Sequence, residues 1–373
     1  MRFAHFSDTH LGYSSYRKLT ADGYNQREED VRDSFVRVID KIIELKPDFC
    51  IHSGDLFDSP RPSNRNIALV LKEFHRLANS GIPTVVIAGN HETPKVKQLG
   101  HIFGILEFFP AIHSVYTGEY KVIRLNGVAI HAIPQCVSVE AFERELERLT
   151  PERDVEYNVL TVHAAIKGIP EFSRGDFNEL FVDEKYFETF HWIALGHYHN
   201  HALVSPNAAY AGSTERFSFA EAAQPKGFVL VDLEKRAHTF VQIPVREMVE
   251  ITIDPSRLST TDLNTEIETL CETLSPEGKI VKFKIQGFEP SQVSLIDFRR
   301  FSVLTRDAVH SAIEVAPEDE ETVSSSPAIQ LSRLSDEFKA YLDRLLKLPE
   351  NERRELQDLG LYYLSLVEEI GSD

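Results

Sequence analysis

Five short apolar runs in this chain each end in side chains that commonly bind metal ions. A short apolar run bounded by turn residues is typical of a buried strand. In open α/β sheets, the carboxyl ends of the strands are where ligands bind. The sequence therefore predicts that five strands bring these polar side chains to one edge of the fold. The five endings are Asp8-Thr9-His10, Gly54-Asp55, Gly89-Asn90-His91, His163 and Gly196-His197-Tyr198-His199.

The segments between the first three runs have the spacing of helices. Apolar residues in 31–43 and again in 67–77 recur as on the buried face of a helix. This strand-helix-strand order predicts parallel strands joined by right-handed crossovers. Farther along, the turn dipeptide Asn126-Gly127 separates two strand-like segments and predicts a hairpin, and short strands are expected up to residue 243. The predicted fold class is α/β (α+β), with a two-sheet β-sandwich core flanked by helices.

Breaks in composition divide the chain into four predicted segments. The first is the core, 1–245, and the second is a small α+β capping domain, 246–313. An acidic linker, 314–327, joins this domain to a pair of amphipathic helices in 328–373. The capping domain is expected to contain strand 249–253, helix 260–273, strand 279–286, helix 291–300 and strand 302–306.

Two helical regions are candidates for contacts with other molecules. The helices expected at 66–80 and 97–108 can form a self-association face, although packing on the sheet is the more common role of such helices. The apolar stripes of the C-terminal pair need a covering surface. They are expected either to fold back on the main body or to dock a partner helix or coiled coil.

Composition narrows the class of protein. The net charge of −18 argues against a general nucleic-acid binder, because phosphate binding usually requires an excess of Lys and Arg. Bound metal ions can, however, invert the local field of a site. No apolar run approaches the roughly 20 residues of a membrane helix, and no signal peptide is recognisable, so we expect a soluble, intracellular protein. Cys50, Cys136 and Cys271 lack metal-binding spacing and are expected to be buried.

The ligand set predicts a pair of metal ions. Seven candidate ligands are too many for one tetrahedral zinc. Two ions about 3.5–4 Å apart, sharing one carboxylate, use all of them. Asp55 is the candidate bridge because it lies between the two halves of the set in sequence. Mixed imidazole and carboxylate ligands suit manganese, iron or zinc better than calcium. The seven are Asp8, His10, Asp55, Asn90, His163, His197 and His199.

Such a site is suited to phosphoester hydrolysis. The positive charge of two divalent ions exceeds the negative charge of its two carboxylates, and the resulting positive site attracts a phosphate ester. A metal pair supplies an activated water near neutral pH. His91, next to Asn90, is the candidate for stabilising the added phosphoryl charge and protonating the leaving oxygen. Asp58 is expected either to orient a ligand histidine or to be a simple loop carboxylate.

Other functions are weaker alternatives. A single histidine is more often structural than a ligand, but five such endings in one chain are not plausibly independent. A generic metallophosphoesterase acting on a small phosphate ester or cyclic nucleotide is the alternative enzyme, and it would have no need of residues 247–373. A non-catalytic scaffold is disfavoured because all seven ligands are present.

The complete set of motifs resembles the calcineurin-like metallophosphoesterase superfamily over residues 1–245. That resemblance rests on Asp8-x-His10, Gly54-Asp55-x-x-Asp58, Gly89-Asn90-His91-Glu92, His163 and Gly196-His197-x-His199. Narrower motifs are similar to those of the Mre/SbcD nuclease subunit of the DNA double-strand-break repair complex. They are Phe6–Tyr13, Gly54–Phe57, Gly212–Phe217, Lys226–Phe228 and Pro244-Val245-Arg246.

The resemblance implies a specific assignment of ligands. Asp8, His10, Asp55 and His199 would hold one manganese ion. Asp55, Asn90, His163 and His197 would hold the other, giving two Mn²⁺ per chain, with other divalent transition metals as alternatives. His91 would be the catalytic histidine. Some members of the family have histidine where this chain has Asp58, so a second catalytic imidazole is not implied here.

The resemblance also implies activity and partners. The expected enzyme is a 3′–5′ exonuclease and endonuclease that processes DNA ends. Its capping domain would bind DNA, its C-terminal helices would bind a Rad/SbcC-type ABC ATPase, and its core would form a homodimer. We therefore expect a cytoplasmic, nucleoid-associated protein. The basic residues in loops near the motif-bearing edge are candidate DNA contacts and, equally, candidate solvated surface charges. They are Arg17, Lys18, Arg61, Arg65 and Arg216.

Overall fold

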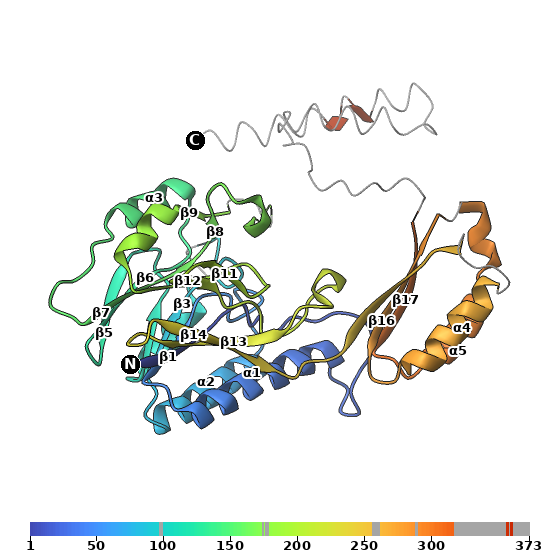
Figure 1. Ribbon diagram of the computed structural model, residues 1–373, viewed down its shortest axis with the longest axis horizontal. Helices are drawn as coiled ribbons and strands as arrows, with labels where there is room; N and C mark the ends of the chain where they lie inside the picture. The colour runs from blue at the N-terminus through green and yellow to red at the C-terminus, as the bar shows by residue number, and fades with distance from the viewer. Residues whose placement is uncertain are drawn as a thin grey trace. The chain divides into compact units, whose positions relative to one another are not determined.

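The computed structural model describes residues 1–96, 100–173, 175, 179–255, 262–287, 290–316, 356, 357, 359 and 360. The chain divides into two compact units, Met1–Ala316 and Pro317–Asp373. Two six-stranded sheets form the core of the first unit, and a three-stranded sheet belongs to a smaller lobe of the same unit (Figure 1). Among the described residues, no helix has both the length and the apolar character needed to span a membrane.

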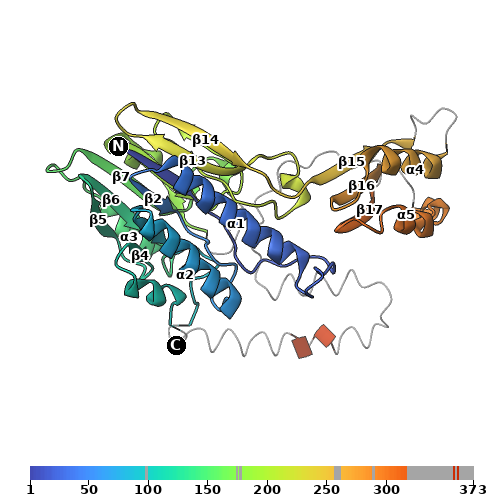
Figure 2. The ribbon, with the colours of Figure 1, turned by 90° about the horizontal axis from the view of Figure 1, so that it is seen from below.

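The first sheet carries the predicted strand-helix-strand units. Its parallel strands are β1 (Arg2–Phe6), β2 (Phe49–His52), β3 (Thr84–Ile87) and β4 (Ile112–Val115). Beyond β1 the sheet continues with β13 (Lys226–Asp232), which is antiparallel to β1, and β14 (Ala237–Ile243), which is antiparallel to β13. The connecting helices α1 (Gln26–Leu45) and α2 (Asn64–Asn79) lie side by side along this sheet (Figures 1 and 2). The parallel pairing predicted from the sequence is thus confirmed.

The second sheet carries the later motifs. Its order is β11 (Ala202–Ser205), β12 (Ala208–Tyr210), β10 (Trp192–Gly196), β7 (Tyr157–His163), β6 (Val128–Ile133) and β5 (Lys121–Leu125). The β5–β6 hairpin turns at Asn126 and Gly127, whose φ angles are 49° and 84°, as the turn dipeptide predicted. Helix α3 (Val139–Glu147) and the short strands β8 (Ala165–Ile166) and β9 (Phe181–Val182) lie on its outer side.

Alternation along the strands creates a layered core. In β1, Phe3 points between the two sheets, where it stacks on Phe49 with ring centroids 4.9 Å apart. Its neighbours Ala4 and Phe6 point the other way, into the apolar cluster formed with α1 and α2, because side chains alternate along a strand. The two sheets therefore pack face to face with helices outside, as predicted, and the motif-bearing ends of β1, β2, β3, β7 and β10 meet at one edge.

The smaller lobe differs in part from the prediction. It consists of β15 (Met248–Ile253), α4 (Leu263–Leu274), β16 (Ile280–Gln286), a 3₁₀ helix (Pro290–Leu295), α5 (Phe298–Leu304) and β17 (His310–Ala316). The predicted strand 302–306 is wrong, and the predicted helix 291–300 is two separate helices. Phe301 and Leu304 are spaced as on one face of a helix, and Phe301 packs edge-on against Phe283. The last strand begins at His310, so the first residues of the expected acidic linker, 314–316, are strand.

Two further predicted regions lie partly or mostly outside the described residues. The region expected as helix 97–108 contains a 3₁₀ helix, Ile102–Phe108, and residues 97–99 lie outside the described residues. The remainder of the acidic linker, 317–327, also lies outside them. Of the predicted C-terminal helical pair, 328–373, only residues 356, 357, 359 and 360 are described, and they are helical.

Two buried histidines in the first sheet should make the fold sensitive to acid. Burial lowers the pKa of His5 and of His52 to about 3, whereas an unfolded histidine has a pKa of about 6.5. Below pH 6.5 the unfolded chain therefore binds protons that the folded chain excludes, and stability is lost as the pH falls. At pH 5, each histidine is expected to cost about 2 kcal/mol relative to pH 7.

Urea unfolding at pH 7 and pH 5 tests this expectation. His52→Gln should lose about 2 kcal/mol less than the wild type between the two pH values. His75→Gln, at an exposed position on α2, should lose as much as the wild type. An unchanged pH dependence in His52→Gln would contradict the assignment of acid sensitivity to this residue.

Candidate metal centre

The structure brings the polar side chains that follow five strands into one cluster, most of which is buried. Asp8 and His10 follow β1, Asp55 follows β2, Asn90 follows β3, His163 ends β7, and His197 and His199 follow β10. Three overlapping groups have ligand atoms within 4.8 Å of one another. The groups are Asp8/His10/His199, His10/Asp55/His91 and Asp8/Asp55/His163.

Asp55 occupies the centre of this cluster. Its Oδ2 lies 3.3 Å from Nε2 of His163 and 3.6 Å from Nε2 of His10. Its Oδ1 accepts a hydrogen bond of 3.0 Å from the backbone N–H of His91. One carboxylate oxygen is therefore shared between histidines from the two halves of the predicted ligand set, which is the placement required of a bridging ligand.

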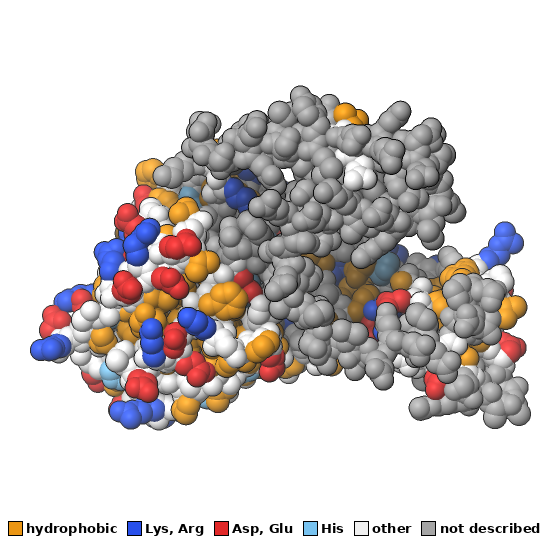
Figure 3. All heavy atoms as spheres, turned by 90° about the horizontal axis from the view of Figure 1, so that it is seen from above, with side chains coloured by type: hydrophobic (Ala, Val, Ile, Leu, Met, Phe, Trp, Pro, Cys, Tyr) orange, Lys and Arg blue, Asp and Glu red, His pale blue; other side chains and the backbone are white. Residues whose placement is uncertain are grey.

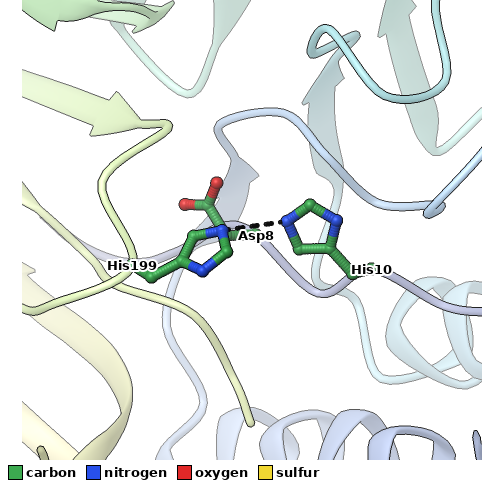
Figure 4. Close-up of side chains that lie close together, drawn as sticks. All are labelled: Asp8, His10 and His199. Carbon is green, nitrogen blue, oxygen red and sulfur yellow. Dashed lines mark hydrogen bonds between the residues drawn. The ribbon is translucent and has the colours of Figure 1, made fainter. Parts of the chain in front are cut away.

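One half of the cluster is formed by Asp8, His10 and His199. The Nε2 atoms of His10 and His199 lie 3.1 Å apart (Figure 4). The Asp8 carboxylate lies beside them and accepts hydrogen bonds from the backbone N–H of His197, at 3.0 Å, and from the Ser7 hydroxyl, at 2.5 Å. These contacts hold the carboxylate next to the two rings.

The other half is formed by Asn90, His163 and His197. The Asn90 side-chain oxygen lies 3.0 Å from Nε2 of His163. The His163 and His197 rings are edge to face, with centroids 5.4 Å apart. Because Asn90 is only partly buried, this half is more open to solvent on the Asn90 side.

Hydrogen bonds behind the four histidines determine which nitrogen faces the cluster. His10 donates through Nδ1 to Asp58 at 3.2 Å, and His199 donates through Nδ1 to Glu221 at 3.2 Å. His163 donates through Nδ1 to the carbonyl oxygen of Ser53 at 2.9 Å. Nε2 of these three rings is therefore directed to the cluster. His197 differs, because its Nε2 donates to Glu179 at 2.5 Å, so Nδ1 is the nitrogen with which it would bind a metal. It belongs to none of the three groups given above for the described residues.

The residues behind the histidines were largely missed from the sequence. Glu179, Glu221 and Ser53 have no motif of their own, and no sequence signal of the kind used above points to them. Asp58 was left with two interpretations. Oδ1 of Asp58 lies 3.2 Å from Nδ1 of His10 and 3.5 Å from Nδ1 of His91. These contacts favour a role in orienting the histidines over that of a free loop carboxylate.

The chain is folded tightly around this cluster. Asp8, His10, Asp55 and His197 all have positive φ, at 50°, 49°, 55° and 103°. This conformation is unfavourable for residues other than glycine and concentrates at functional sites. Two neighbouring glycines are required by close contacts. A Cβ at position 89 would lie 2.2 Å from Oδ1 of Asp55, and one at 196 would lie 2.0 Å from the Ser53 carbonyl oxygen.

The electrostatics of the cluster favour added positive charge. Burial alone would raise the pKa of Asp8 and of Asp55, but the neighbouring histidines outweigh burial and lower both. Burial opposes the charge on His163, yet the adjacent Asp55 carboxylate raises the pKa of His163 to about 9. Buried anions with converging imidazole nitrogens and an amide oxygen form a donor set that fits divalent transition-metal ions.

His91 is placed differently from the other histidines. Its ring is 38% exposed and lies edge to face with His10, with centroids 4.5 Å apart. The hydrogen bond with Asp58 is the main reason that its pKa is raised to about 9. His91 is therefore a cationic, solvent-accessible group at the rim of the cluster at neutral pH, with its Nδ1 directed to Asp58.

The five candidate DNA contacts have different surroundings. Arg17 and Lys18 are exposed and line a cavity of about 530 Å³ together with Arg306 of the smaller lobe. Arg65 is paired with Glu29 at 2.9 Å and stacks over Tyr24.

The guanidinium of Arg216 donates to the backbone carbonyl oxygens of Gln224 and Arg246, so it supports the fold, whereas Arg61 is exposed. On the face shown in Figure 3, acidic and basic side chains of the described residues are interspersed over the larger lobe. Among these five residues, Arg17, Lys18 and Arg61 are thus the most accessible to a phosphate backbone.

Comparison with known proteins gives consistent results. Residues 1–201 match the family model described as calcineurin-like phosphoesterase. The DNA double-strand break repair protein Mre11 of Methanococcus maripaludis is 30% identical over 340 residues, which cover 84% of this chain and 87% of that protein. The protein of the same name from Methanocaldococcus jannaschii is 32% identical over 68% of this chain and 69% of its own. That of Thermoplasma acidophilum is 28% identical over 91% and 89%.

Proposed function

Because this chain belongs to the calcineurin-like phosphoesterase family, and within it to the family of the archaeal DNA double-strand break repair protein Mre11, we propose that it is a metal-dependent DNA nuclease. Its substrates are DNA ends at double-strand breaks, which it processes as a 3′–5′ exonuclease and as an endonuclease. The observation that carries this proposal is the position of Asp55, which is shared between two groups of converging ligands.

Two manganese ions are the proposed cofactors. Asp8, His10 and His199 would hold one ion, Asn90, His163 and His197 would hold the other, and Asp55 would be shared by both. Mixed carboxylate, amide and imidazole ligands support manganese, although iron and zinc accept similar sets. A metal pair of this kind supplies an activated water at neutral pH and neutralises charge on the phosphoryl oxygens.

The residues of the chain position the substrate and move the proton. Asp58 holds Nδ1 of His91 and keeps the ring cationic, so that its other nitrogen is available to the leaving oxygen. A protonated imidazole there stabilises added phosphoryl charge and then donates its proton to the departing alkoxide. The other side chain that Nδ1 of His91 faces is the Asp58 carboxylate, at 3.5 Å, so one catalytic imidazole is proposed.

Binding of DNA and of partner proteins is proposed for the other parts of the chain. The capping domain, 246–313, is proposed to bind DNA beside the core. The C-terminal segment, 328–373, is proposed to bind a Rad/SbcC-type ABC ATPase, and the core to form a homodimer through helices such as α2. These roles imply an intracellular enzyme that works at the nucleoid.

A direct assay tests the proposed substrate. The purified full-length chain is incubated with manganese and either a linear DNA duplex or bis-p-nitrophenyl phosphate, with EDTA as the metal-free control. We expect manganese-dependent degradation of the duplex from its ends. Hydrolysis of the small ester with the duplex intact, even at low salt, would contradict the nuclease proposal and favour a phosphoesterase of small substrates.

The exposed pair Arg17 and Lys18 should contribute to DNA affinity. Replacing both by alanine removes two candidate phosphate contacts, so the slope of log K against log salt should fall by about 2 for duplex DNA. Hydrolysis of bis-p-nitrophenyl phosphate should not change. The matched control is Lys235→Ala/Arg236→Ala, an exposed pair in the β13–β14 turn at the opposite end of the sheet. Equal slopes for the two double variants would exclude Arg17 and Lys18 as DNA contacts.

A further inference from the structure

A fully buried lysine lies behind one of the proposed metal ligands. Lys226 is the first residue of β13 and is 1% exposed. Burying an ammonium group is costly unless it is paired and hydrogen-bonded. We propose that Lys226 is a positioning residue that holds His199 in the orientation required of a metal ligand. This inference rests on the proposed function, because it takes His199 as a ligand.

The ammonium of Lys226 contacts the backbone of His199 directly. Its Nζ donates to the His199 carbonyl oxygen at 2.9 Å and to the Ser213 hydroxyl oxygen at 2.8 Å. Ser213 in turn donates its backbone N–H to the same carbonyl oxygen at 2.9 Å. The loop that carries His199 is therefore fixed from behind by groups of two other segments of the chain.

Lys226 also acts on the ring of His199 through Glu221. Its Nζ lies 2.6 Å from Oε2 of Glu221, and Oε1 of the same carboxylate accepts from Nδ1 of His199 at 3.2 Å. The backbone N–H of Phe217 adds a hydrogen bond of 3.3 Å to Oε2. The Phe217 ring packs against both His10 and His199, with centroids 5.0 and 5.2 Å away. One cation thus fixes both the backbone and the ring of the ligand.

The chemistry of this arrangement explains the need for a cation. A carboxylate behind a ligand histidine fixes the tautomer and increases the basicity of the nitrogen that faces the metal. Glu221 can do this only while it remains an anion directed at Nδ1, and a buried carboxylate remains so when a cation is paired with it. Lys226 is the cation that pairs with Glu221, and its ammonium group also donates to the backbone of the loop that carries His199.

The expected effect is confined to one of the two metal ions. Lys226→Met keeps a long, unbranched side chain and removes the ammonium group, so Glu221 loses its ion pair. Loss of a group that orients a ligand typically weakens metal binding by about 10–100-fold. The ion held by His199 should be weakened by this amount. The ion held by His163 and His197 should not, because those rings donate to the Ser53 carbonyl oxygen and to Glu179.

Calorimetric titration of manganese into the metal-free full-length chain tests the inference. The wild type should show two classes of site, and His199→Gln identifies the class to which His199 belongs. Lys226→Met should weaken that same class selectively. Lys279→Met is the matched control, because Lys279 is also ion-paired, to Glu247 at 3.2 Å, but lies in the smaller lobe. It should bind manganese as the wild type does.

Glu221→Gln provides a second test that does not require Lys226→Met to fold. It should weaken the same class, and the double variant should be weakened by less than the sum of the two single effects, because both changes remove the Lys226–Glu221 ion pair. Equal weakening of both classes, no weakening, or additive effects would overturn the inference while leaving the metal pair intact. A wild-type chain that binds no manganese would overturn the proposed metal centre and this inference with it.

Discussion

Asp55→Asn is expected to lower phosphodiesterase activity by about a thousandfold, which corresponds to about 4 kcal/mol of lost transition-state stabilisation. The amide replaces the carboxylate oxygen that faces His163 at 3.3 Å and His10 at 3.6 Å. A neutral group with one oxygen cannot serve two cations as a carboxylate does. Both metal ions should therefore bind more weakly, whereas loss of a ligand of one ion alone should weaken chiefly that ion.

The variant can be tested by manganese titration and by hydrolysis of bis-p-nitrophenyl phosphate. Asp48→Asn is a suitable control, because Asp48 accepts a hydrogen bond from the backbone N–H of Arg2 at 2.7 Å and lies before β2, away from the cluster. It should retain two metal ions and normal activity. Weakening of only one class of site in Asp55→Asn would show that Asp55 is not the bridge.

His91→Ala is expected to lower activity by about 10²–10⁴-fold, the usual contribution of a general acid or base. Manganese binding should be retained, because the proposal uses the His91 ring for proton transfer and not as a ligand. The pKa of His91 is raised to about 9 by its hydrogen bond with Asp58. Asp58 therefore favours the protonated ring, and activity that depends on the acid form should fall as the pH rises through the pKa of His91.

The pH dependence separates this role from a structural one. This alkaline decline should be present in the wild type and in His113→Ala, a control on β4, and absent from the residual activity of His91→Ala. Loss of manganese from His91→Ala would instead identify His91 as a ligand. An unchanged rate would exclude it from catalysis.

Much of the fold could be predicted because local sequence signals agree with it. The apolar runs that form β1, β2, β3, β7 and β10 are short and end at turn residues. Both their strand conformation and the positions of their ends could therefore be predicted. The hairpin at Asn126 and Gly127 was predicted for the same reason. In contrast, Phe301 and Leu304 lie in a short apolar segment, whose period cannot distinguish strand from helix without the packing partner.

The supporting residues of the site could not be predicted because their contacts join distant segments. His199 contacts Glu221 and Lys226, which lie 22 and 27 positions later. Lys226 begins a motif that resembles those of the family, but nothing in that motif indicates a contact with His199. Likewise, Arg216 seemed suited to DNA binding from its place in a loop, but the fold uses its guanidinium to hold carbonyl oxygens. A candidate ligand that directly follows a predicted strand can be recognised in the sequence. A hydrogen-bond partner that another loop supplies can be identified only in the structure.

The most direct test of the two-metal centre is anomalous diffraction at the manganese edge from crystals of the full-length chain grown with manganese. Two peaks about 3.5–4 Å apart are expected, one on each side of the Asp55 carboxylate, with His199 beside one and His163 beside the other. A single peak, or peaks that do not share Asp55, would contradict this two-metal centre.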